Sequence, residues 1–282
     1  MIKDFLTKRK RNHLATEMGL RFSRATLTSA RRKLDATNPT SWEFAGFCQN
    51  QEDGISDYLL SQLKQKNRYF IEIGSSNGLE NNTAWLAFGL KYSGLMVEGS
   101  EALVRDAQTH LRPYNWGVKY LPLFVTQSTA QNIVDAALFK DPDFFSLDID
   151  GNDYYILKTM MTQGLRPKII VVEYNAAFGP DAALTIPYDD RFSYQKAHAS
   201  ECYFGVSISA WRQLLEAAGY AFVTVESNGV NAFFIDKACF EPHFISALKG
   251  LAFAENFALR RKHGLGWETH FQLVKDMPYV RL

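Results

Sequence analysis

Three aspartates stand close together in the stretch FFSLDIDGNDYYIL, residues 144–157. Asp148 and Asp150 end an apolar run that is typical of a buried strand, and Asp153 begins a segment with helical spacing. Because side chains alternate along a strand, we expect Asp148 and Asp150 to lie on the same face. Like charges at such a strand end indicate a site that uses carboxylates, either as a general base or as ligands for a hard cation.

Two chemical roles are open for these aspartates. In the first, Asp150 is a general base for a hydroxyl group, and Asp148 orients a substrate or an ammonium group. In the second, Asp150 binds Mg²⁺ together with Glu173 and Asn175, which stand at the end of the next predicted strand. A structural role, as a helix cap or a first-turn acid, is the alternative for Asp150 and the one that we expect for Asp153.

His198 is a further candidate catalytic residue. It lies in the long polar and aromatic segment 175–205, and long insertions of this kind tend to be lids or binding loops. We predict that this insertion contacts the acceptor substrate and that His198 serves as a base or proton shuttle. A lone histidine is also a common surface residue, so a structural role stays open for it.

A glycine-containing turn follows the first predicted strand, in FIEIGSSNG, residues 70–78. The spacing is G-x-x-x-G, so the fingerprint of pyrophosphate binding is incomplete. Glu72, near the end of this strand, would repel a pyrophosphate and suits a ligand with an ammonium group. Glu98 ends the second strand, where a carboxylate can accept hydrogen bonds from a ribose diol. S-adenosylmethionine (SAM) carries both an ammonium group and a ribose diol. The alternative is that Glu72 and Glu98 are ordinary acids at strand ends without a role in binding.

Strands and helices alternate through the middle of the chain, which predicts a mostly parallel sheet covered on both faces. The predicted strands are 68–74, 94–99, 118–125, 144–150 and 168–174, and the helices between them are 81–92, 101–111, 129–139 and 153–164. A helix at 207–219 and an antiparallel hairpin of strands 221–227 and 231–236 follow. The predicted fold is therefore an α/β, Rossmann-like, seven-stranded sheet with a C-terminal antiparallel hairpin, the arrangement of class I methyltransferases.

The chain divides into three predicted parts: a basic N-terminal helical extension at 1–50, a SAM-binding domain at 51–240, and a C-terminal helical tail at 241–282. Residues 1–33 carry a net charge of +8, which leaves −7 for the rest of a chain whose total is +1. This basic arm predicts contact with an anionic surface or partner. The alternatives are a solvated helix, packing on a neighbouring subunit of a homo-oligomer, or a transit peptide.

Five motifs together resemble the FkbM-type family of SAM-dependent methyltransferases: QEDGI (51–55), FIEIGSSNGLENN (70–82), LMVEGSE (95–101), LDIDGNDYYIL (147–157) and VVEYN (171–175). The resemblance implies O-methylation of sugars or of sugar-decorated metabolites. It also implies a cofactor site formed by Glu72, Gly74, Ser75, Ser76, Asn77, Gly78, Glu98, Gly99, Ser100 and Asp148. This chain has Asp-Ile-Asp-Gly where many members have Asp-x-Glu-Gly, and the two terminal segments lie outside the resemblance.

The predicted function is SAM-dependent O-methyl transfer to a small-molecule or glycan acceptor. N-methylation of nucleic acid or protein is an alternative, although DIDGNDYY has no proline after its acid. An NAD-linked sugar oxidoreductase or epimerase is a second alternative, which Glu72 disfavours, and a non-catalytic scaffold is a third. No apolar run approaches the length of a membrane span, and three scattered cysteines form no CxxC pair, so we expect a cytoplasmic protein.

Overall fold

The computed structural model describes residues 2–264 and 266–282, with side chains from residue 14 onward. A seven-stranded sheet forms its centre, in the order β3-β2-β1-β4-β5-β8-β7. The strands are β1 (Tyr69–Ile73), β2 (Ser93–Glu98), β3 (Val118–Pro122), β4 (Phe144–Leu147), β5 (Ile169–Glu173), β7 (Tyr220–Val225) and β8 (Asn231–Asp236). Strands β1 to β5 are parallel, and β8 is antiparallel to both of its neighbours. This topology confirms the predicted Rossmann-like class I methyltransferase fold.

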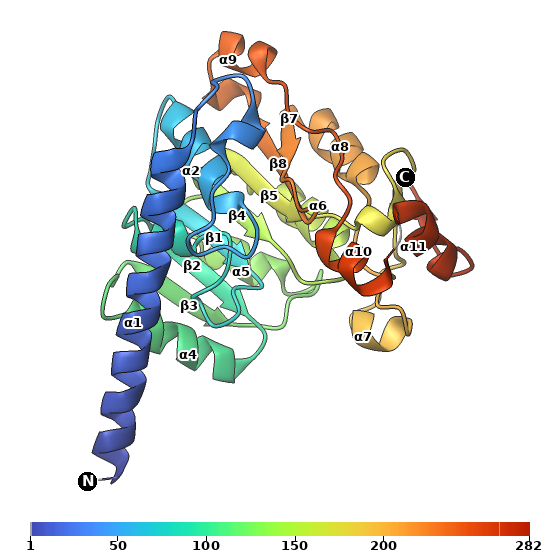
Figure 1. The fold of residues 1–282 in the computed structure, drawn as a ribbon. Helices are drawn as coiled ribbons and strands as arrows, with labels where there is room; N and C mark the ends of the chain where they lie inside the picture. The colour runs from blue at the N-terminus through green and yellow to red at the C-terminus, as the bar shows by residue number, and fades with distance from the viewer. Residues whose placement is uncertain (1, 265) are drawn as a thin grey trace.

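Helices pack on both faces of the sheet (Figure 1). They are α2 (Glu52–Gln62), α3 (Ala84–Phe88), α4 (Glu101–Leu111), α5 (Ala130–Ala136), α6 (Asp153–Thr162) and α8 (Ile208–Ala217). Each strand contributes side chains to the cores on both faces of the sheet, because its side chains alternate in direction. In β1, for example, Ile71 and Ile73 join a core that includes residues of α5, α6 and α8, whereas Phe70 joins a second core beneath α2 and α3.

Most predicted elements are present, and the main difference concerns the ends of the strands. The helix at 101–111 and the strand at 231–236 have the predicted bounds. The fourth strand, expected to reach residue 150, ends at Leu147, and Asp150 has a left-handed backbone with φ of 54°. The prediction that Asp148 and Asp150 share one face of a strand is therefore wrong, because both residues belong to the loop after the strand.

The insertion packs against the later part of the C-terminal tail, whereas α9 (Pro242–Ala247) of the tail packs beside α2 (Figure 1). The insertion contains η2 (Ala176–Phe178), β6 (Leu184–Thr185) and α7 (Tyr194–Ala197). After β8 come η3 (Lys237–Cys239), α9, α10 (Phe257–His263), α11 (Trp267–Val274) and β9 (Val280–Arg281). Strand β9 pairs antiparallel with β6, and a third core unites Phe178, Leu184 and Tyr203 of the insertion with Leu259 and Val274 of the tail.

The N-terminal extension is helix α1 (Ile2–Arg31), followed by the short helix η1 (Pro39–Trp42). Met18 and Ala25 of α1 are buried against the domain, whereas the first part of the helix extends beyond it (Figure 1). Arg21 donates to the carbonyl of Phe47, and Phe22 contacts the Phe47 ring with centroids 5.1 Å apart. Within the described residues, no helix has the length and apolar character that a membrane crossing requires.

The third core predicts that the tail is part of the cooperative fold. Val274→Ala removes two buried methyl groups from this core, and we expect it to lower the free energy of unfolding by about 2 kcal/mol. The adjacent and exposed Leu273 is a matched control, and Leu273→Ala should change stability by less than about 0.5 kcal/mol. Urea denaturation of both variants measures the difference. If Val274→Ala changed the free energy of unfolding as little as Leu273→Ala does, the tail would not be part of the cooperative fold.

Candidate active site

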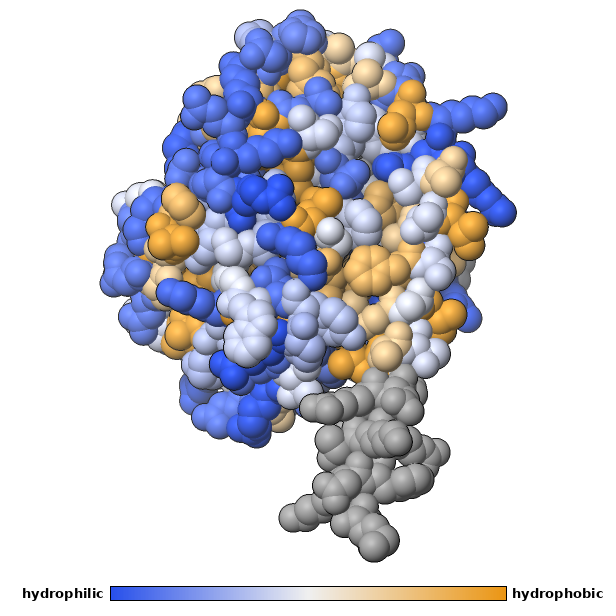
Figure 2. Space-filling model, turned by 90° about the vertical axis from the view of Figure 1, so that its left-hand side faces the viewer, coloured by the Kyte–Doolittle hydropathy of each residue, from blue (hydrophilic) through white to orange (hydrophobic). Residues whose placement is uncertain are grey.

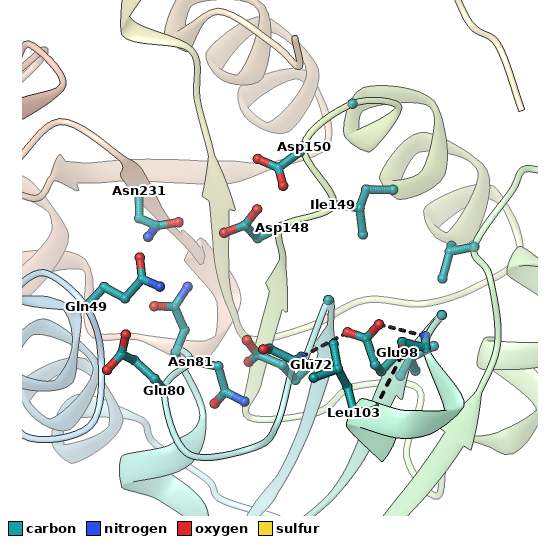
Figure 3. Close-up of a pocket in the computed structure, with 18 of the residues that line it drawn as sticks. Gln49, Glu72, Glu80, Asn81, Glu98, Leu103, Asp148, Ile149, Asp150 and Asn231 are labelled. Atoms are coloured by element: carbon teal, nitrogen blue, oxygen red, sulfur yellow. Dashed lines mark hydrogen bonds between the residues drawn. The ribbon is translucent and has the colours of Figure 1, made fainter. Parts of the chain in front are cut away.

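A cavity of about 630 Å³ opens at the carboxyl ends of β1, β2 and β4 (Figure 3). This is the edge at which open α/β sheets bind ligands, and the volume is within the range of small-molecule sites. Its lining comes from the segments after β1, β2, β3 and β4, from the segment at the start of α2, from the β7–β8 hairpin, and from Phe192 of the insertion. The acids predicted at the ends of β1, β2 and β4 therefore meet in one place: Glu72, Glu98, Asp148 and Asp150.

Gly74 brings two of these turns into direct contact. Its φ is 84°, and a Cβ atom at this position would lie 1.8 Å from the carbonyl oxygen of Asp148. Any side chain here would separate the turn after β1 from the loop after β4. The amides of Gly74 and Ser75 also donate to the carbonyl of Val97 in β2, at 3.0 and 3.1 Å. The glycine thus fixes the spacing of three adjacent strand ends.

Glu98 connects the turns after β1 and β2. One carboxylate oxygen accepts a hydrogen bond from the amide of Ser76 at 3.0 Å, and the other accepts one from the amide of Ser100 at 2.8 Å (Figure 3). Each oxygen retains a lone pair for a ligand in the cavity. Leu103 and Phe124 line the cavity beside it and supply an apolar surface. This end of the cavity suits a ligand with a diol next to a flat ring.

Glu72 lies deeper, with its side chain almost completely buried. One of its carboxylate oxygens, Oε2, has no hydrogen-bond partner among the described residues. Burial, reinforced by the charge of Asp148, raises the pKa of Glu72 to about 8. A buried carboxylate without a partner is costly. A cationic ligand group in the cavity would remove that cost by pairing with it.

Asp148, Asp150 and Glu173 form a cluster of carboxylates whose oxygens lie within 4.8 Å of one another. Burial, followed by the charge of Asp150, raises the pKa of Asp148 to about 8. Burial, followed by the charge of Asp153, raises the pKa of Asp150 to about 6. The pKa of Glu173 is also well above its usual range, first through burial and then through Asp148. Near neutral pH this arrangement favours a carboxylate on Asp150 next to a protonated Asp148. The same oxygens could instead bind a divalent cation.

Asp153 has the structural role that we expected. Its two carboxylate oxygens accept hydrogen bonds from the amides of Ile149 at 3.0 Å and Gly151 at 2.8 Å. These bonds hold the loop after β4 in the bend that turns Asp150 toward the cavity. Phe192 of the insertion packs over this bend, since a Cβ on Gly151 would lie 2.7 Å from its ring. The insertion therefore reaches the cavity through Phe192.

Several candidate residues lie elsewhere. The side chain of Asn175 makes structural hydrogen bonds: it accepts from the amide of Ala177 and donates to the carbonyls of Cys202 and Phe204. Asn175 does not line the cavity. His198 pairs with the hydroxyl of Ser200 and does not line the cavity. Three residues of the glycine turn, Ser75, Asn77 and Gly78, also lie outside the lining, whereas Gly74, Ser76, Gly99 and Ser100 belong to it.

The structure adds a polar wall that sequence reasoning missed. It consists of Gln49, Asn50, Glu52, Glu80, Asn81 and Asn231 (Figure 3). Asn231 donates to Glu52 at 2.8 Å. Its own carbonyl oxygen, Oδ1, has no hydrogen-bond partner in the described part of the chain, although the residue is buried. Arg21 of α1 pairs with Glu80 at 2.9 Å, which connects the N-terminal extension to this wall. The signal available in the sequence was the run of amides and acids in QNQED, residues 49–53.

The cavity has a strongly one-sided charge. Glu52, Glu72, Glu80, Glu98, Asp148 and Asp150 line it, and the described lining includes no lysine, arginine or histidine. A phosphate or pyrophosphate would face carboxylates here without any compensating cation. Neutral or positively charged ligands suit this surface better.

Neither a protein-family model nor a curated protein matches the sequence. Among solved structures, similar chains include an O-methyltransferase from Bacillus cereus in complex with SAH, at 18% identity and a TM-score of 0.43, with 78% of this chain and 89% of that one covered. The SAH-bound methyltransferase from Podospora anserina has 17% identity and a TM-score of 0.43, with 65% of this chain and 79% of that one covered. The SAM-bound magnesium protoporphyrin IX methyltransferase from Synechocystis PCC 6803 has 11% identity and a TM-score of 0.41, with 66% of this chain and 78% of that one covered.

At these identities and TM-scores the likeness is a general one. It leaves the activity and the substrate of this chain open, and membership of the FkbM-type family stays a prediction.

The buried carboxylates predict an unusual dependence of stability on pH. The pKa values of Glu72 and Asp148 are about 8 in the folded chain, against an ordinary value near 4 in an unfolded one. Between these values the folded chain holds protons that the unfolded chain has released, so its stability falls as pH rises from about 4 to about 8. Glu72→Gln should be neutral near pH 4 and stabilising by about 1 kcal/mol or more at pH 8.

Urea denaturation of the ligand-free protein at several pH values measures this trend. Asp181→Asn, which changes an exposed carboxyl of the insertion, is the matched control and should show no such dependence on pH. A gain from Glu72→Gln that is the same at pH 4 and pH 8 would contradict the buried, protonated state of Glu72.

Proposed function

We propose that this chain is a SAM-dependent O-methyltransferase that modifies a hydroxyl group of a carbohydrate or glycosylated metabolite. The observation that carries the proposal is the carboxylate-lined cavity, whose described lining has no cation, with Glu98 at one side and Asp148 and Asp150 of the carboxylate cluster at another. These two groups suit the two partners of a methyl transfer, a cofactor that has a ribose and an acceptor that must lose a proton.

The residues fit SAM in three respects. Glu98 would accept hydrogen bonds from the ribose hydroxyls, and Leu103 and Phe124 would pack against the adenine. The unpartnered Oε2 of Glu72 marks a place for positive charge near the methionine portion, and Gly74 keeps the turn close to it. When bound, SAM supplies an electrophilic methyl group on a sulfonium centre, and its positive charges match the carboxylates of the cavity.

Asp150 is the proposed general base. A hydroxyl group is a poor nucleophile near neutral pH, so a carboxylate has to accept its proton as the methyl group is transferred. The pKa of Asp150, about 6, is lower than that of Asp148, about 8, so Asp150 is the first of these two acids to ionise. Asp148 and Glu173 lie next to it, since carboxylate oxygens of the three residues lie within 4.8 Å of one another. Placing the acceptor oxygen in line with the methyl group is the remaining task of the cavity.

The polar wall supports a sugar-like acceptor. Amides and carboxylates, such as Asn50, Asn81 and Asn231, can both donate to and accept from hydroxyl groups. The free carbonyl oxygen of buried Asn231 would accept from such a hydroxyl. Phe192 adds an aromatic surface at the same cavity. The lack of cations in the described lining favours an unphosphorylated acceptor.

The same charge pattern weighs against the alternatives. Nucleic acid and NAD both carry phosphates, which would meet Glu72 and Glu98 without a compensating cation. Mg²⁺ bound by Asp148, Asp150 and Glu173 is the competing explanation of the cluster, and it would lower the pKa of an acceptor hydroxyl in place of a base.

Cys48, Cys202 and Cys239 are free cysteines, which supports the proposal of a cytoplasmic protein.

Binding of SAH tests the cofactor assignment. We expect the wild-type protein to bind SAH with a dissociation constant in the micromolar range, about −8 kcal/mol. Glu98→Gln replaces one acceptor oxygen by a donor that faces backbone amides, so binding should weaken at least about tenfold. Isothermal titration calorimetry measures both, and Glu101→Gln on the exposed first turn of α4 is the control. Absence of SAH binding by the wild type would remove the basis of the proposal.

Asp150→Asn tests the base. Asparagine tolerates the left-handed backbone of this position, so the loop should keep its shape and SAH binding should persist. We expect methyl transfer to fall about 10²-fold or more. With the wild type, the rate should rise as pH increases through about 6, because Asp150 must be ionised. Loss of activity in EDTA and recovery with Mg²⁺ would favour the metal, and full activity of Asp150→Asn would exclude both roles.

A further inference from the structure

The edge of the sheet opposite the cavity has its own distinctive surface. Strands β3, β2, β1 and β4 are parallel neighbours, so the segments that precede them lie side by side at their amino ends. These segments are residues 112–117, 89–92, 64–68 and 138–143, and we call them together the amino-end edge. Nothing in the proposed methyl transfer uses them.

Large apolar side chains protrude from this edge. Trp116 is 84% exposed, and Leu138 is 64% exposed. Tyr114 and Phe139 are also exposed, on the same two segments. Tryptophan is usually well buried in a domain, so an indole held in water indicates a contact surface.

Hydrogen bonds join these segments into one continuous surface. Arg68 donates to the carbonyl of Leu90 and lies over the Tyr92 ring, 4.7 Å from its centroid. Lys91 donates to the carbonyl of Tyr114 at 2.7 Å. Asn67 donates to the carbonyl of Asp141 at 2.7 Å, which connects the segment before β1 to the one before β4. The protruding groups are therefore held on a fixed backbone.

Unpaired cations surround the apolar groups. Lys66, Arg68, Lys91, Arg112 and Lys140 are exposed, and none of them has an ion pair within the described part of the chain. The carboxylates of these segments are Asp141 and Asp143, and Asp143 is buried against Lys168. Figure 2 views this side of the molecule and shows hydrophilic side chains interspersed with apolar ones.

We propose that the amino-end edge docks on an anionic membrane surface. Lysine and arginine attract acidic lipid headgroups, while tryptophan favours the boundary between headgroups and acyl chains. Leu138 and Phe139 would bury apolar area at the same boundary. The aliphatic Leu138 contributes little to stacking on nucleobases, and this favours lipid over nucleic acid. The contact is peripheral, and it does not depend on the methyltransferase assignment.

The location of this surface has a consequence for the cavity. Cavity and amino-end edge lie at opposite ends of the parallel strands. A protein docked in this way keeps its cavity open to the aqueous side, so the acceptor arrives from solution. The basic arm at residues 1–33 provides a second source of attraction to the same anionic surface.

Vesicle co-sedimentation of the full chain tests the proposal. We expect binding to vesicles that contain phosphatidylglycerol, weakening with salt, and little binding to pure phosphatidylcholine. Trp116→Ala and the charge reversal Lys66→Glu/Arg112→Glu should each weaken binding at least about fivefold. The matched controls are Leu273→Ala, another exposed apolar residue, and Arg261→Glu/Lys275→Glu, the same charge change on the tail. Thermal melts of all variants verify that they fold.

Three outcomes would overturn the proposal. The first is a wild-type protein that does not bind anionic vesicles. The second is binding that the edge variants and the control variants reduce equally, which would assign the attraction to overall charge or to the basic arm. The third is binding to an RNA duplex, in place of vesicles, with the same sensitivity to Trp116→Ala, which would make the edge a nucleic-acid site.

Discussion

The close contact between Gly74 and the carbonyl of Asp148 is the constraint on which the site depends. Only a residue without a Cβ allows the turn after β1 to touch the loop after β4. Because β1 pairs with β2 on one side and β4 on the other, this contact draws three strand ends together. Glu98 then bridges two of the turns, and Asp153 holds the third loop in its bend. The cavity is what remains between these fixed parts.

Charge divides the molecule along the direction of its parallel strands. Carboxylates collect at the carboxyl ends, where burial and neighbouring charges raise the pKa values of Glu72, Asp148 and Glu173. Unpaired cations and exposed aromatic groups collect at the amino ends. A net charge of +1 conceals this separation. Burying acidic side chains at the carboxyl ends of the strands lowers the stability of the ligand-free fold. Residues with such a cost persist where they serve a function, and this supports ligand binding at that edge of the sheet.

Segments outside the central sheet complete the cavity. Phe192 comes from an insertion whose position is fixed by a core shared with the C-terminal tail. Glu80 is paired with Arg21 of the N-terminal helix, which also contacts the backbone before α2. The N-terminal extension therefore acts on the polar wall, and the C-terminal tail acts through the insertion on the loop after β4. Neither extension supplies a strand to the central sheet. They are the natural places for differences in acceptor preference to arise.

The sequence by itself determined the fold and the strand-end acids, because apolar runs, helical periodicity and glycine turns are local signals. Glu72, Glu98, Asp148 and Asp150 follow from the rule that ligands bind at the carboxyl ends of parallel strands. Only the tertiary structure placed Asn231 and Glu80 at the same cavity and removed Asn175 and His198 from it. It also showed that Asp148 and Asp150 belong to a bent loop, held by Asp153, and not to a strand. Such outcomes rest on contacts between residues far apart in the chain, or on a single left-handed backbone position, and local periodicity carries no record of either.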